Sequence, residues 1–131
     1  MSHDLKTDHF SLINNPSIKG REDKYQTIEV NLDAILQSWK ISLFSFEWLT
    51  PEGKIRSAAQ LPEIEKEKYE EVLALYNSGS ALERPILGIG VMDNIEIGSR
   101  RDVLLTLYTQ GIRKLSVHIP KSNMKDFAPY L

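Results

Sequence analysis

The fold is decided by the stretch Ile95-Glu96-Ile97-Gly98-Ser99-Arg100-Arg101. Its first three residues alternate apolar and polar side chains, which predicts a short strand. The apolar residues that follow, between Val103 and Tyr108, are spaced as one stripe of a helix. We therefore expect a strand to end at Gly98-Ser99, the pair that opens this helix.

A strand that ends where a helix begins is a favourable place for an anion. The first turn of a helix has unpaired backbone N–H groups and a partial positive charge. Gly98 permits close approach, Ser99 offers a hydroxyl, and Arg100 and Arg101 supply forked donors. These four residues form a candidate phosphate site. The alternative that stays open is an ordinary Ser N-cap beside two solvent-exposed arginines.

The segments around this stretch predict a small sheet. Residues 85 to 91 are largely apolar and read as a strand, and residues 92 to 94 as the turn to the next strand. Gly111 is placed to close the helix. Leu115 to Ile119 then alternates as a final strand, with His118 on its solvated face. The order at this end of the chain is strand, strand, helix, strand.

Further upstream, apolar positions from Tyr69 to Tyr76 predict a helix that begins near Pro62 and stops at residues 77 to 79. Residues 27 to 32 alternate as a strand, and Asp33 is placed to cap a helical turn through Leu36. An aromatic-rich run from Trp39 to Leu49 leads to a turn at residues 50 to 53, with residues 54 to 57 as the returning arm of a hairpin. We divide the chain into an irregular N-terminal arm, residues 1 to 26, and one α+β domain, residues 27 to 131.

Charge is unevenly spread along the chain. The helix near residues 61 to 84 is acidic, and pairs such as Glu65 with Lys68 favour a solvated helix face. The last quarter is basic, and Arg113 and Lys114, just past the far end of the last helix, are expected to extend the basic surface. The three histidines lie far apart without metal-ligand spacing, so we expect no metal site.

The chain resembles proteins of the ParB/sulfiredoxin-like fold. The resemblance is carried by Pro85-Ile86-Leu87, by Ile95 to Arg101 with its Gly-x-Arg-Arg pattern, and by Leu115-Ser116-Val117-His118-Ile119-Pro120. In that family, a strand after a helix is followed by a second strand, a phosphate motif at a helix start and a closing strand. The resemblance implies a mixed sheet with two main helices, a nucleotide or nucleic-acid phosphate as ligand, and a role in plasmid, phage or chromosome biology.

The chain departs from the pattern of that family at several positions. Ser99 stands where sulfiredoxins carry their cysteine, which excludes cysteine-based chemistry. Partition proteins usually carry Glu there and small residues on the next turn, where this chain has Leu104 and Leu105. Only residues 121 to 131 follow the closing strand, so we expect no helix-turn-helix domain.

Hydrolysis of a bound nucleoside triphosphate with magnesium would need a carboxylate as a metal ligand or general base. Asp93, Glu96 and Asp102 are the nearby candidates. We assign none of them a catalytic role. The competing hypothesis is a non-catalytic interaction module, such as an inhibitor or adaptor, which contacts a protein partner through residues 39 to 48 and 62 to 76.

The composition of the chain excludes several kinds of chemistry and predicts its location in the cell. The chain has 131 residues, a net charge of -2 and no cysteine. Disulfides, thiolate metal sites and cysteine nucleophiles are therefore excluded. Without an apolar run long enough to span a bilayer or a signal-peptide pattern at Met1, we expect a cytoplasmic protein that has no contact with membranes.

Overall fold

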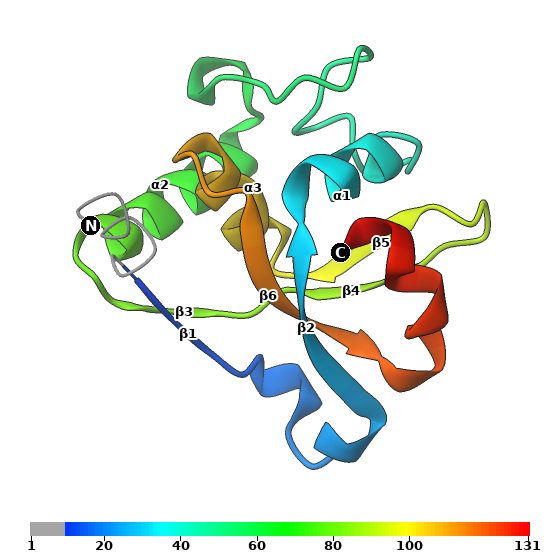
Figure 1. Cartoon of the computed structure of the whole chain (residues 1–131). Coiled ribbons are helices and arrows are strands. Elements are labelled where there is room, and N and C mark those ends of the chain that lie inside the picture. Colours follow the sequence, from blue (N-terminus) through cyan, green and yellow to red (C-terminus); the bar gives the residue numbers. More distant parts are fainter. Residues whose placement is uncertain (1–9) are drawn as a thin grey trace, which may run out of the picture.

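The computed structural model describes residues 10–131 and is built around a four-stranded mixed sheet (Figure 1). Its strands, in spatial order, are β2 (Tyr25–Asn31), β6 (Lys114–Pro120), β4 (Ile86–Ile89) and β5 (Ile95–Ser99). The sheet is mixed because β6 runs antiparallel to β2 and parallel to β4, while β4 and β5 form an antiparallel pair. The expectation of a small α+β domain with a mixed sheet is confirmed.

Three α-helices accompany the sheet: α1 (Leu32–Trp39), α2 (Glu63–Asn77) and α3 (Arg101–Thr109). Helices α2 and α3 pack against each other, whereas α1 packs against β5 and the C-terminal 3₁₀ turns at Lys125–Tyr130 (Figure 1). Gly79 and Gly111 follow α2 and α3 with φ of 74° and 93°. This left-handed conformation suits glycine and ends both helices where the sequence predicts. Among the described residues, no helix is long and apolar enough to cross a membrane.

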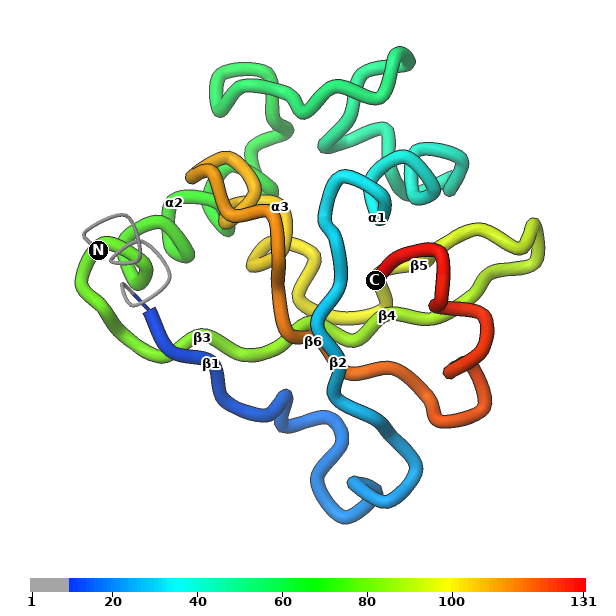
Figure 2. Tube along the Cα trace, viewed as in Figure 1, coloured from blue at the N-terminus to red at the C-terminus, as the bar shows by residue number. Residues whose placement is uncertain are grey.

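The N-terminal segment contains a short strand that the sequence does not reveal. Strand β1 (Ser11–Ile13) pairs in parallel with β3 (Ala81–Glu83), and the two run side by side in Figure 2. Two 3₁₀ turns then lead into β2. Three residues are too few to show a period, and the pairing joins positions 70 residues apart. The part of the expected arm before Phe10 lies outside the described residues.

Several boundaries differ from expectation. Strand β2 ends at Asn31, whose side chain, rather than that of Asp33, caps α1 by accepting a 3.2 Å hydrogen bond from the Ala34 N–H. Strand β5 continues through Gly98 and Ser99, so α3 begins only at Arg101. The prediction that Gly98 and Ser99 open the helix is therefore wrong by two residues.

The prediction that His118 lies on a solvated face is also wrong. Its side chain is only 1% exposed, because the N-terminal segment at Asn15 covers this face of β6. Alternation along β6 shows which residues share a face, but it does not show that a distant segment buries the second face.

The aromatic run after α1 divides between core and surface. Trp39 and Trp48 are fully buried in the core, whereas Phe44 and Phe46 are exposed. The run ends in the expected hairpin, which is reduced to one antiparallel bridge between Leu49 and Ile55. The segment therefore anchors itself through its tryptophans and presents its phenylalanines outward.

Candidate functional site

A polar pocket of about 390 Å³ lies where β5 passes into α3. Residues 97 to 102 line one wall, so the pocket includes all four residues of the predicted phosphate motif. The opposite wall is formed by Glu65 and Lys68 of α2. Strand β5, helix α3 and helix α2 thus bring the predicted motif together with Glu65 and Lys68, which precede Gly98 by 33 and 30 positions.

Arg100 is the residue between the strand and the helix, and its backbone is left-handed, with φ 58° and ψ 43°. Glycine adopts this conformation easily, but for other residues it costs about 1–2 kcal/mol. No side chain caps the helix at this position. The expected alternative, an ordinary Ser99 N-cap, is not found, because the N-cap residue is Arg100.

The Arg100 side chain lies between two carboxylates. Its Nη2 is 3.4 Å from Asp102 Oδ2, and its Nε is 3.8 Å from Glu83 Oε1. The Nε atom is buried, and the described residues give it no hydrogen-bond partner. Arg100 therefore lies at ion-pair distances from two carboxylates, but these contacts leave its Nε without a hydrogen bond.

Arg101 points to a different part of the molecule. Its Nη1 donates a long 3.3 Å hydrogen bond to the Phe44 backbone oxygen and lies 4.0 Å from Glu47 Oε1. Its guanidinium lies 5.9 Å from the centre of the Trp39 ring. The two arginines therefore diverge, and they do not form the single fork that the sequence suggests.

Ser99 is bound into a buried polar network. Its Oγ accepts a 3.0 Å hydrogen bond from Asn15 Nδ2, and the same Nδ2 donates to the Arg84 backbone oxygen. The Asn15 backbone N–H donates to His118 Nε2 over 3.1 Å. This network fixes the end of β5 and connects it to the N-terminal segment.

His118 holds this network in one protonation state. Because its Nε2 accepts the hydrogen bond from Asn15, the ring proton is on Nδ1, which lies 3.0 Å from Thr27 Oγ1. Burial, with a smaller contribution from the charge of Arg84, lowers the pKa of His118 below its usual value. The neutral ring is thus the form that the fold requires.

Two carboxylates in the pocket are already engaged. Asp102 Oδ1 accepts a 2.9 Å hydrogen bond from the Val103 N–H in the first turn of α3. Glu65 is 7% exposed and accepts a 2.8 Å hydrogen bond from Trp48 Nε1, while its other oxygen lies 3.7 Å from Lys68 Nζ. The Asp102 carboxylate therefore occupies part of the anion position that the sequence assigns to phosphate.

Glu65 and Lys68 are pocket residues that sequence reasoning missed. Their spacing predicts the observed ion pair, but nothing in a charged helix indicates that Glu65 is buried against Trp48. The Lys68 side chain is 51% exposed and leaves its ammonium group accessible at the pocket.

Arg113 and Lys114 do not adjoin the pocket. They follow the opposite end of α3, where Arg113 stacks on Tyr108 at 3.7 Å from the ring centre and donates to the Tyr108 backbone oxygen. Lys114 begins β6 and is exposed. These contacts complete the C-terminal end of the helix, so any basic surface there is separate from the polar pocket.

The three carboxylates considered for magnesium have separate surroundings. Asp93 lies in the β4–β5 turn, Glu96 is hydrogen-bonded to Ser42 and Asn94, and Asp102 accepts the Val103 N–H in the first turn of α3. Within residues 10–131, no three His, Asp or Glu side chains form a group that could hold a metal ion. We therefore derive no step that depends on magnesium.

Comparison with known proteins adds no further constraint on the site. No family model, no curated protein and no solved structure matches the chain. The interpretation of the polar pocket therefore depends on its own geometry.

Proposed function

We propose that the chain is a phosphate-binding protein of ParB/sulfiredoxin-like type, and that it holds the phosphate of a nucleotide or nucleic acid in the polar pocket at residues 97 to 102. The observation that carries this proposal is Arg100, a strained, left-handed arginine at the start of α3 whose buried Nε has no hydrogen-bond partner among the described residues. Strain of this kind is concentrated at functional sites.

The pocket offers three kinds of donor to a phosphate. The first turn of α3 presents backbone N–H groups and the positive end of the helix dipole. Arg100 offers a forked guanidinium, and Lys68 brings a half-exposed ammonium from the facing helix. A phosphate would draw Arg100 away from Asp102, replacing one anion at the helix terminus with another.

The element order also supports the family resemblance. Apart from the short strand β3, which lies between α2 and β4, helix α2, strands β4 and β5, helix α3 and strand β6 follow one another in the order that the resemblance implies. The Gly-x-Arg-Arg pattern lies at the start of α3, as in that family. The role in plasmid, phage or chromosome biology rests on this resemblance alone.

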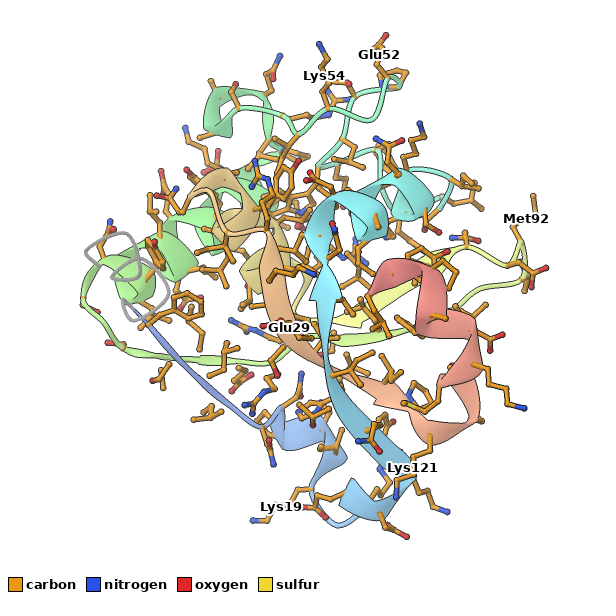
Figure 3. All side chains as sticks on the ribbon, viewed as in Figure 1. Lys19, Glu29, Glu52, Lys54, Met92 and Lys121 are labelled. Atoms are coloured by element: carbon orange, nitrogen blue, oxygen red, sulfur yellow. The ribbon has the colours of Figure 1, made fainter. Side chains whose placement is uncertain are left out.

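Thermal melting and calorimetric titration test the proposal. A ligand that binds only the folded chain raises Tm, so the chain is melted with nucleoside triphosphates, with and without magnesium, and with a single-stranded oligonucleotide. Arg100→Ala and Lys68→Ala should each weaken binding about tenfold or more, the usual effect of losing a charged hydrogen bond. Lys54→Ala is the matched control, because Lys54 is an exposed lysine on the turn after Pro51, outside the pocket lining (Figure 3).

The proposal fails if no phosphate compound raises Tm, or if a folded Arg100→Ala variant binds as tightly as the wild type. A response to the oligonucleotide alone would identify nucleic acid as the ligand. A response to triphosphates alone would identify a nucleotide.

A further inference from the structure

An apolar groove of about 650 Å³ lies beside the polar pocket. It runs between the loop after α1, residues 40 to 47, and the turn that joins β4 to β5, residues 90 to 94. Its large apolar side chains come from both segments: Ile41, Leu43, Phe44, Val91 and Met92. Figure 3 shows Met92 at the outer tip of the β4–β5 turn.

These side chains are unusually exposed for their type. Leu43 is 86% exposed, and Val91 is fully exposed at the tip of the turn. Single exposed apolar residues are common, but contiguous groups of them on a soluble domain typically mark interaction sites. Here two segments separated by about 50 residues converge to form one such group.

Hydrogen bonds within the chain fix the base of the groove. Ser42 Oγ donates a 2.6 Å hydrogen bond to Glu96 Oε1, which ties the loop to β5. Asn94 Nδ2 donates to the other Glu96 oxygen over 3.1 Å, and the Gly90 N–H closes the turn on the Asn94 oxygen over 2.7 Å. A prearranged surface loses less entropy when it binds.

The charges that line the groove favour an acidic partner. Among the described residues, the charged residues that line the groove are Glu96 and Arg101, and both carboxylate oxygens of Glu96 already accept hydrogen bonds. Besides its contacts with the Trp39 and Phe44 rings, the Arg101 guanidinium has, among the described residues, only long polar contacts, to the Phe44 oxygen and to Glu47, and its side chain is 29% exposed. Most of its five donors remain available for a carboxylate.

We infer that this groove docks a segment of another protein in which bulky apolar side chains flank a carboxylate. The apolar side chains would cover Leu43, Phe44 and Met92, and the carboxylate would bind Arg101. A second copy of this chain fits less well. A two-fold contact places the same surface on both sides, and within residues 10–131 no carboxylate with an unused oxygen lines the groove to meet Arg101.

Peptide selection provides the test. Random 16-residue peptides displayed on phage are selected on the immobilised full chain, and the enriched peptides are synthesised with a fluorescent label for binding measurements. The enriched peptides should share Asp or Glu beside large apolar residues. Phe44→Ser should weaken their binding about tenfold or more, as the loss of a central aromatic side chain does at interfaces. Arg101→Gln should weaken it about threefold to fivefold.

Ile64→Ser is the matched control, because Ile64 is 66% exposed on α2 but does not line the groove. It should leave peptide binding unchanged, and the melting of each variant shows whether it is folded. The inference is overturned if no peptide is enriched, if the enriched peptides lack acidic residues, or if they bind Phe44→Ser as well as wild type. A concentration-dependent dimer that Phe44→Ser abolishes would also overturn it, in favour of self-association.

The groove shares Arg101 with the polar pocket, but the Phe44→Ser variant separates the two sites. Phe44 does not line the polar pocket, so the Phe44→Ser variant should keep any binding of phosphate compounds. Failure of one proposal therefore leaves the other standing.

Discussion

Replacing Arg100 with glycine should abolish phosphate binding but change the stability of the protein only slightly. Relief of the left-handed backbone stabilises the variant by about 1–2 kcal/mol. The greater freedom of glycine in the unfolded chain costs about 0.5–1 kcal/mol. Loss of the ion pairs costs about 1–2 kcal/mol, because Glu83 is partly exposed but Asp102 is buried and keeps only its hydrogen bond from the Val103 N–H. The free energy of unfolding should therefore fall by no more than about 2 kcal/mol, while phosphate binding is lost.

Arg101→Gly is the matched comparison for this experiment. Arg101 has ordinary helical geometry in the first turn of α3, so glycine there relieves no strain and costs about 1 kcal/mol of helix propensity. It also removes the contacts of the guanidinium with Trp39 and Phe44. Urea denaturation followed by circular dichroism measures both variants. If Arg100→Gly is destabilised by more than Arg101→Gly, Arg100 is a structural residue and the reasoning is refuted.

Three further predictions concern single residues. Thr106→Val removes a fully buried hydroxyl that has no hydrogen-bond partner among the described residues. It should therefore raise the free energy of unfolding, measured by urea denaturation, by about 1 kcal/mol. A loss of stability would contradict this prediction. The lowered pKa of His118 means that the unfolded chain gains a proton first as pH falls below about 6.5. Stability should therefore fall as the solution is acidified through that range, and less steeply in His118→Gln. Asp102→Asn keeps an oxygen that can accept the Val103 N–H, but it removes the negative charge that competes with phosphate. Calorimetry should therefore show tighter phosphate binding. Weaker binding would instead assign Asp102 a direct role in holding the phosphate.

The regular elements could be predicted because their patterns are local. Alternation along Leu115 to Ile119 predicts most of β6, and the spacing from Tyr69 to Tyr76 predicts α2, which ends before Gly79. The pairing of β1 with β3 could not be predicted, because two three-residue strands show no period. Its stability depends on partners that are distant in sequence.

For the candidate site, the sequence names residues that line one pocket but not their geometry. The four residues of the Gly-x-Arg-Arg pattern all line the polar pocket, and their role in binding phosphate stays a prediction. The sequence does not reveal that Arg100 is left-handed, that Arg101 turns toward Phe44, or that Lys68 faces the motif. Each of these three features depends on the position of a helix in the folded chain, and that position is determined by tertiary packing.

A phosphate site in the polar pocket is tested most directly by a nuclear magnetic resonance titration of backbone amides with a nucleoside triphosphate. We expect the largest shifts to fall on the amides of residues 98 to 102 and to disappear in the Arg100→Ala variant. Amides that remain unmoved at saturating ligand, or shifts centred on Arg113 and Lys114 instead, would contradict a phosphate site at the start of α3.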